Sequence, residues 1–312
     1  MSPRPDQPVP EVEFESYYGR QIIKTPTWKT PDVPLYLFLG GLAGGSALLA
    51  EGAALSGDRD LERFTRLVAA AGAGAGTVFL VHDLGRPSRF LNMLRVLKPT
   101  SPLSVGSFIL APFASLSSAA AAAQVTGRLP RLGRLAGVGA AAFGGPLTTY
   151  TAALLANTAV PAWHSARREL PFVFAGSGAA AAGGLALAAL PPRSTGPARR
   201  MAVAGAALEV AAVTTMEHQL GMVAEPYQQG RSGRLMRVAR AATVAGAGLA
   251  TVAGRSRLLR AVAGTALVTG SVITRFGVFE AGLASARDPK YTVVPQKERL
   301  AARALHDATV AG

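Results

Sequence analysis

The sequence contains no cysteine. This absence excludes disulfides, thiolate nucleophiles and iron–sulfur clusters held by the chain's own cysteines. Charge is also scarce, because Asp, Glu, Lys and Arg together make up 16% of the residues, against roughly 25% in an average soluble domain. Aromatic residues are only 6%. The low charge argues against both a disordered chain and a single water-soluble globule.

The residues that are abundant are small and apolar. Hydrophobic residues reach 49%, the chain holds 35 glycines, and its mean hydropathy is +0.28. Small residues are typical of contacts between closely packed transmembrane helices. The formal net charge is +14, and many arginines lie in short gaps between apolar runs. This pattern favours a membrane protein with basic loops over a protein that binds nucleic acid.

Eight runs are long and apolar enough to cross a bilayer, which takes about 20 residues. The sequence therefore predicts an all-α integral membrane protein with eight transmembrane helices in a domain of residues 35–280. We expect residues 1–34 to form an N-terminal extramembrane segment and residues 281–312 a C-terminal tail. The eight predicted helices are 35–56, 64–85, 103–124, 134–157, 170–190, 199–220, 236–253 and 258–280.

An even number of crossings puts both termini on one side of the membrane, which we call side A. The opposite side, side B, holds four short loops, and three of them contain arginines but no acid. Basic residues in short loops favour the cytoplasm. We therefore expect a multi-pass protein of the cytoplasmic (inner) membrane, with side B inside. The termini and the longer connectors would lie on the non-cytoplasmic side.

Ionisable groups within a bilayer are costly and mark candidate functional sites. Glu209 lies in the middle of the sixth predicted helix, and Glu51 lies toward side B in the first. Structural explanations remain open for several others, since histidines at helix ends can sit among lipid headgroups and tyrosines can belong to an interfacial belt. The groups placed toward side A are His82, Asp83, Tyr150, Glu217, His218, Arg275 and Glu280.

A haem within the membrane needs axial ligands, usually histidines on facing helices. His82, His164 and His218 lie near side A and His306 lies in the tail, so none is mid-span. The chain has no HExxH pair and no phosphate-binding Walker motif. We therefore expect no haem and no metal in this chain. Any electrons it handles would come from a partner and end on a diffusible organic molecule.

Three stretches resemble the polysulfide reductase membrane subunit family (NrfD/PsrC). They are YLFLGGLAGG at 36–45, HDLGRPSRFLNMLRVLKPTSPLS at 82–104 and YTAALLANTAVPAWHSARRELPFVF at 150–174. The resemblance implies two four-helix bundles and a quinone, menaquinone or ubiquinone, bound near the face where a ferredoxin-like iron–sulfur subunit docks. A molybdopterin catalytic subunit often lies beyond that partner.

The resemblance also implies roles for particular residues. Tyr150 matches a tyrosine that can hydrogen-bond a quinone carbonyl, and His82 and Asp83 match positions that line the pocket or its proton route. Trp28 and Tyr36 resemble another wall of the pocket. The candidates for a proton path are Glu51, Glu209, Glu217, His218, Arg275 and Glu280. The candidates for partner docking are Arg86, Arg89, Trp163 and Arg167.

The sequence thus predicts a quinone- or quinol-binding membrane anchor of a respiratory oxidoreductase complex, which exchanges electrons with an iron–sulfur partner. The alternative is a secondary transporter or proton-conducting protein, supported by Glu51, Glu209 and Arg275 within predicted helices. Clearly broken half-helices, typical of many transporters, are not evident in the sequence. A third reading is a purely structural anchor for a soluble enzyme.

Overall fold

A computed structural model describes residues 22–310, and all of their regular structure is helical. Residues 1–21 and 311–312 lie outside the described part of the chain, as do the side chains of Pro87 and of residues 301–310. Most of the predicted extramembrane segment 1–34 is therefore not described, and neither is the side chain of His306.

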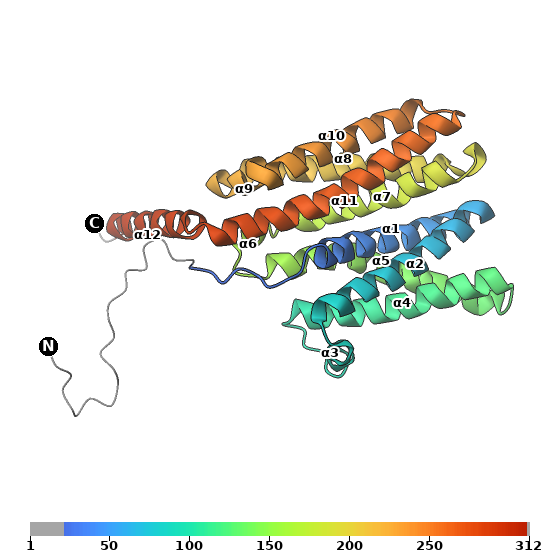
Figure 1. The fold of residues 1–312 in the computed structure, drawn as a ribbon, viewed down its shortest axis with the longest axis horizontal. Coiled ribbons are helices and arrows are strands. Elements are labelled where there is room, and N and C mark those ends of the chain that lie inside the picture. The colour runs from blue at the N-terminus through green and yellow to red at the C-terminus, as the bar shows by residue number, and fades with distance from the viewer. Residues whose placement is uncertain (1–21, 311–312) are drawn as a thin grey trace.

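Eight long helices form the body of the protein (Figure 1). Six of them are long and apolar enough to cross a membrane, namely α1, α2, α4, α7, α10 and α11, so the chain is a multi-pass membrane protein. The other two, α5 and α8, have 27 and 24 residues. The bounds are α1 Asp32–Ser56, α2 Arg59–Leu84, α4 Pro102–Thr126, α5 Pro130–Ala156, α7 Leu170–Ala189, α8 Gly196–Gln219, α10 Gly230–Val252 and α11 Arg257–Arg287.

Each predicted run corresponds to one of these helices, but most of the helices are longer than their apolar runs. α2 begins at Arg59 rather than at residue 64. α10 begins at Gly230 rather than at residue 236, and α11 continues to Arg287 rather than ending at residue 280. Hydropathy marks the apolar part of a helix, whereas a helix can continue beyond the hydrocarbon layer while its long basic side chains extend into water. α11 ends where Asp288 and Pro289 follow, because proline cannot continue the backbone hydrogen bonds.

Most of the connectors on side A contain short helices that the hydropathy pattern did not indicate. They are too short to cross a membrane, and three of them start within a turn of a proline. The predicted tail also contains a helix, α12, at Lys290–Val310. The short helices on side A are α3 Pro87–Met93, α6 Pro161–Ser165, η2 Gly221–Ala224 and α9 Glu225–Gln228, and η1 Pro192–Ser194 lies on side B.

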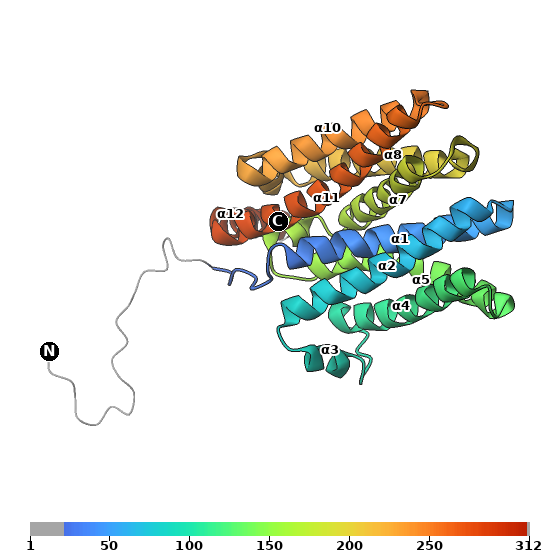
Figure 2. The same cartoon turned by 45° about the vertical axis from the view of Figure 1, so that its right-hand side comes forward.

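The long helices contact one another in two sets. In one set, α1 packs on α2 and α5, and α4 packs on both α2 and α5; we call α1, α2, α4 and α5 the N-terminal helix group. In the other, α7 packs on α8 and α11, and α10 packs on both; these four are the C-terminal helix group. The groups meet where α1 contacts α7 and α11 and where α5 contacts α7 (Figures 1 and 2).

Glycines allow the central helices to approach closely. Gly44 of α1 faces Gly144 of α5, and Gly41 of α1 faces Gly178 of α7 on its other side. A Cβ atom on Gly178 would lie 2.8 Å from the Gly41 carbonyl oxygen, a distance that forbids any side chain without movement of a backbone. Small residues thus place α1 between the two groups, where helix packing in a membrane depends on close backbone contact.

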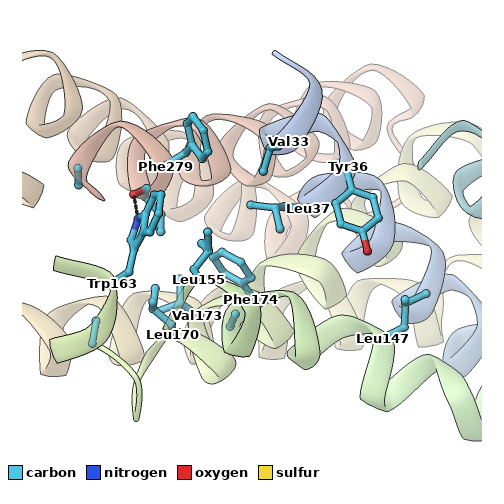
Figure 3. Packing of buried hydrophobic residues seen from close by; sticks show 14 of the residues in the cluster. Val33, Tyr36, Leu37, Leu147, Leu155, Trp163, Leu170, Val173, Phe174 and Phe279 are labelled. Carbon is cyan, nitrogen blue, oxygen red and sulfur yellow. Dashed lines mark hydrogen bonds between the residues drawn. The ribbon is translucent and has the colours of Figure 1, made fainter. Parts of the chain in front are cut away.

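On side A, the core that lies between the two groups contains the largest buried side chains (Figure 3). Trp163 from α6, Phe174 from α7 and Phe279 from α11 are all fully buried and belong to one hydrophobic cluster with Leu37 of α1. The side-A end of the protein is therefore a packed junction of both groups and not a set of loose loops.

Candidate functional site

Residues 22–31 precede α1 and connect the two helix groups on side A; we call them the side-A strap. Trp28 stacks on Trp163 of α6, with ring centroids 5.5 Å apart and an interplanar angle of 22°. The next residue, Lys29, donates its backbone N–H to Asp83 Oδ1 at 2.8 Å and its Nζ to the His82 carbonyl at 3.1 Å. The strap therefore holds the predicted residues His82 and Asp83 beside the start of α1.

The His82 imidazole has an acidic partner that the sequence pattern did not reveal. His82 Nδ1 lies 2.6 Å from Oδ2 of Asp32, whose side chain is only 7% exposed, whereas that of His82 is 71% exposed. An ionised carboxylate only accepts hydrogen bonds, so Nδ1 donates and Nε2 is left for another partner. Asp32 thereby fixes the orientation of a ring that is open to its surroundings.

An open groove of about 500 Å³ lies beside this pair. Its polar groups are Lys29 and His82, and its apolar wall is formed by Val78 and Val81 of α2, with Thr77 and Gly85 completing the lining. Ligand sites in proteins commonly measure about 300–1,000 Å³ and combine apolar walls with a few polar groups. The groove thus has the size and lining of a small-molecule site.

The two predicted tyrosines lie in different places. Tyr36 of α1 is buried, with 3% of its surface exposed, and its ring packs near Gly76 of α2. Tyr150 of α5 is half-buried and its ring lies against Gly106 of α4, where no other side chain would fit. Within the described residues, Tyr150 makes no hydrogen bond and no ring contact with His82, and it does not line the groove beside His82.

Trp163 was predicted as a docking residue, but the structure places it in the core. It is 0% exposed, its Nε1 donates to the Val278 carbonyl at 2.8 Å, and its ring lies 5.7 Å from that of Phe279 (Figure 3). Its ring also occupies the space where a side chain at Gly282 would be. Trp163 therefore forms the buried surface on which Trp28 of the strap stacks, and it does not itself face a partner.

The other three predicted docking residues are exposed. Arg86 and Arg89 lie at the side-A end of α2 and in α3, and Arg167 follows α6. Arg89 donates to the Leu84 carbonyl at 3.0 Å, and Arg167 donates to the His164 carbonyl at 3.4 Å. Within the described residues, none of the three has an acidic partner, so side A presents basic groups to its surroundings.

Glu51 belongs to a buried ionic cluster near side B. Its two carboxylate oxygens lie 3.1 Å from Arg66 and 3.0 Å from Arg134. Arg66 also contacts Glu62 at 2.9 Å and donates to Gln124 Oε1 at 2.8 Å. The cluster brings together side chains from α1, α2, α4 and α5, and these partners come from positions that sequence analysis did not single out.

Glu209 lies in the middle of α8 and is 3% exposed. Thr274 of α11 donates to its Oε1 at 2.6 Å, and Thr243 of α10 approaches its Oε2 at 3.5 Å. No cation in the described part of the chain lies within 4 Å of this carboxylate. A cavity of about 10 Å³ borders Glu209, which is the space that one water molecule needs.

Arg275 follows Thr274 in α11 and is completely buried. Its guanidinium donates to the carbonyls of Phe174, at 2.9 Å, and Leu37, at 3.4 Å, and its Cζ lies 3.9 Å from the centre of the Phe174 ring. Its Nη1 has no hydrogen-bond partner. Arg275 thus connects α11 to α7 and α1, across the boundary between the two groups.

The remaining predicted proton-path residues, which are Glu217, His218 and Glu280, make no contact with Glu51 or Glu209 among the described residues. Glu217 pairs with Arg240 of α10 at 2.6 Å. His218 is exposed and Glu280 is half-buried, and neither makes a side-chain hydrogen bond or ion pair within residues 22–310. The predicted proton-path residues therefore belong to separate clusters around Glu51, Glu209 and Glu217.

A further polar cluster on side A was not predicted. Glu225 of α9 accepts hydrogen bonds from Lys290 Nζ at 2.8 Å and from the Tyr291 hydroxyl at 3.1 Å, both from α12. These bonds, first from Lys290 and then from Tyr291, lower the pKa of the Glu225 carboxyl. The bond to Glu225 raises the pKa of Lys290 in turn. The cluster ties the C-terminal helix to the side-A connector.

Tyr227 anchors the same region. Its hydroxyl donates to the Ala162 carbonyl at 3.1 Å from a position that is 1% exposed, and burial raises its pKa. Ser285 Oγ of α11 accepts a hydrogen bond from the Ala162 N–H at 3.2 Å. α6 is therefore held by α9 and α11.

Among the described residues, no group of three or more His, Asp or Glu side chains could hold a metal ion.

These observations define an all-helical, multi-pass membrane protein with polar groups gathered at one end and in the centre of its helix groups. Residues 23–216 match the model of the family described as polysulphide reductase, NrfD. The chain belongs to this family, whose members are membrane subunits of respiratory oxidoreductases. The match runs from the side-A strap through most of α8. No curated protein matches the chain.

Proposed function

We propose that this chain is the quinone-reactive membrane subunit of a respiratory oxidoreductase complex. The observation that carries the proposal is the groove beside α2, where Lys29 and His82 stand at the edge of an apolar wall. The groove lies within the part of the chain that matches the family. We propose that α5 and α8 also cross the bilayer, which makes eight spans in two four-helix bundles.

A quinone, menaquinone or ubiquinone, fits this groove in size and polarity. When bound, it accepts or releases two electrons and two protons. The protonated imidazole of His82 can donate a hydrogen bond from Nε2, and Lys29 can donate from Nζ, to a carbonyl oxygen on which negative charge develops. Asp32 keeps the imidazole oriented and balances a positive charge on it. Val78 and Val81 exclude water from one side of the ring.

Tyr150 is then a second candidate donor. It lies on α5, apart from the groove, and its hydroxyl is not used within the described structure. A quinone held by the Tyr150 hydroxyl would lie beside α5 and not in the groove lined by Lys29 and His82. The two positions give different results in mutants, so one experiment decides between them.

The test is quinone turnover by the purified complex in which one residue of this chain is changed. We expect His82→Ala to lower kcat at least tenfold. His164→Ala is the matched control, because His164 is also exposed on side A and does not line the groove. Tyr150→Phe distinguishes the two positions, since a loss in Tyr150→Phe with normal turnover in His82→Ala moves the quinone to α5. Normal turnover in both variants refutes the quinone role of both residues.

We further propose that side A faces away from the cytoplasm and receives a ferredoxin-like iron–sulfur subunit, with a molybdopterin subunit beyond it. The supporting observation is that Arg86, Arg89 and Arg167 are exposed on this side and have no acidic partner among the described residues. Reversal of two charges, Arg86→Glu with Arg89→Glu, should abolish co-purification of the partner. Arg128→Glu with Arg131→Glu on side B is the control, and equal partner yield in both variants contradicts the docking site.

Proton conduction without electron transfer is the second candidate function, and the carboxylate of Glu209 supports it. A buried acid held by hydroxyl groups beside a water-sized cavity can exchange a proton with that water. The decisive measurement is proton flux into liposomes that contain this chain alone. Proton flux through the unchanged chain that disappears in Glu209→Gln favours proton conduction. No flux through the unchanged chain favours the quinone-linked role.

A further inference from the structure

The side-B end of the C-terminal helix group carries positive charge that acids of the described residues balance at one position only. No Asp or Glu occurs in residues 178–208 or 226–279, and these stretches include the side-B halves of the four helices and the loops between them. The same stretches supply six arginines to this end: Arg193, Arg199, Arg200, Arg255, Arg257 and Arg260. Of these, only Arg193 has an acidic partner in the described structure, Asp60 of α2 at 2.8 Å.

Two of these arginines stand over an apolar groove. The groove measures about 470 Å³ and lies between α8 and α10, with Arg199, Arg200, Val203, Ala204, Ala207 and Thr251 in its lining. The spacing of Arg200, Ala204 and Ala207 puts them on one face of α8. Arg199 and Arg200 are both exposed, one turn from the start of α8 at Gly196. The cationic end of the groove is thus at the membrane surface and its apolar end points toward the bilayer.

We propose that this groove binds an anionic phospholipid. The phosphate pairs with the guanidinium groups of Arg199 and Arg200, and the acyl chain lies along Val203, Ala204 and Ala207. Basic pockets between transmembrane helices, with apolar walls below them, suit anionic lipid headgroups. The positive end of the α8 dipole adds to the attraction. The proposal is independent of the quinone site, which lies on side A of the other helix group.

The shape of the groove separates a lipid from a soluble anion. An inorganic phosphate needs only the two arginines. A lipid also needs the open surface of the groove, which exists because Ala204 and Ala207 are small and exposed. A bulky side chain at Ala207 should therefore block a lipid but leave an anion site intact.

The experiment is native mass spectrometry of the full chain in detergent, titrated with phosphatidylglycerol or, for comparison, phosphatidylcholine. We expect tighter binding of phosphatidylglycerol and about thirtyfold weaker binding in Arg199→Gln with Arg200→Gln. Arg128→Gln with Arg131→Gln removes the same charge from exposed side-B positions of the N-terminal group and should bind normally. Equal affinity of the two double variants overturns the proposal.

A second pair of variants tests the apolar part of the groove. Ala207→Phe should weaken phosphatidylglycerol binding at least tenfold, whereas Ala122→Phe, at an exposed position near the side-B end of α4, should not. Both substitutions point away from the core, so both proteins should fold. Unchanged binding in Ala207→Phe overturns the lipid site, as does displacement of the lipid by millimolar inorganic phosphate.

Discussion

Two glutamates within the helices, half-buried Glu51 in one helix group and buried Glu209 in the other, are stabilised in different ways. Glu51 lies near the side-B end of α1 and has two arginine partners, Arg66 and Arg134. Glu209 lies in the middle of α8 and receives hydrogen bonds from threonine hydroxyls instead. Near a membrane surface, arginines can reach an acid while their stems stay in apolar surroundings. At the centre of a helix group, uncharged donors stabilise a carboxyl group without adding a second charge.

The glycines that lie beside these two glutamates also have different roles. A Cβ on Gly137 of α5 would lie 2.5 Å from Glu51 Oε1 and 2.7 Å from an Arg66 nitrogen. Gly137 thus leaves room for the ion pair. Around Glu209, the close approach is between backbones, since a Cβ on Gly176 of α7 would lie 2.6 Å from the Glu209 N–H nitrogen. Small residues accommodate a salt bridge beside Glu51 and a helix crossing beside Glu209.

The largest effect should come from Arg66→Met. The side chain of Arg66 is 7% exposed and contacts both Glu51 and Glu62. Its loss leaves two acids without their shared cation, which costs about 3–5 kcal/mol of the free energy of unfolding when such a pair is buried. Thermal unfolding in detergent measures the effect. Arg63→Met is the control, because Arg63 lies exposed on the same helix; equal melting temperatures would show that the cluster adds no stability.

A smaller effect should separate the two glutamates themselves. Glu51→Gln weakens charge-assisted bonds to two arginines, so we expect a loss of about 1.5–3 kcal/mol. In Glu209→Gln the amide oxygen still accepts the Thr274 hydroxyl, so we expect a loss of about 1 kcal/mol or less. Chemical denaturation of both variants compares them directly. A larger loss in Glu209→Gln would mean that the carboxylate of Glu209 is stabilised by more than its hydroxyl donors.

The smallest effect concerns an ion pair outside the helix groups. Lys290 holds the pKa of Glu225 below its usual 4.5, so this contact stabilises the protein fully above that pH and is lost as the pH falls through the lowered pKa. The pair is partly exposed, and 1 M salt, with a Debye length of about 3 Å, should weaken it. Hydrogen exchange, corrected for the intrinsic pH dependence of amide exchange, should therefore show weaker protection of α12 at acidic pH or high salt.

The buried Glu51 cluster provides the contrast for that experiment. Its exchange protection in α1 and α2 should change little in 1 M salt, because buried pairs are poorly screened. Lys290→Gln should reproduce the effect of acid on α12 at neutral pH. If salt releases α12 and the side-B ends of α1 and α2 alike, the two ion-pair environments are equivalent and the distinction between them is wrong.

The helices were predictable because apolar runs report membrane crossings directly, and all six candidate spans fall on predicted runs. The family was also predictable, since its motifs are local in sequence. The partners of the polar residues were not. Asp32 lies 50 positions from His82, and Thr274 lies 65 from Glu209. Such pairs depend on which helix faces which, and hydropathy carries no information about helix rotation. Trp163 was misplaced at the surface for a related reason, because only the space left at Gly282 allows its burial.

The side-A strap has one further consequence. The chain contains two tryptophans, and they are the pair that stacks where the strap crosses α6. The intrinsic tryptophan emission of the whole protein therefore originates at a single junction, between a segment bound to one helix group and a helix packed on the other. Any event that shifts the strap, whether arrival of a partner or occupation of the groove at His82, can be followed optically without attaching a label.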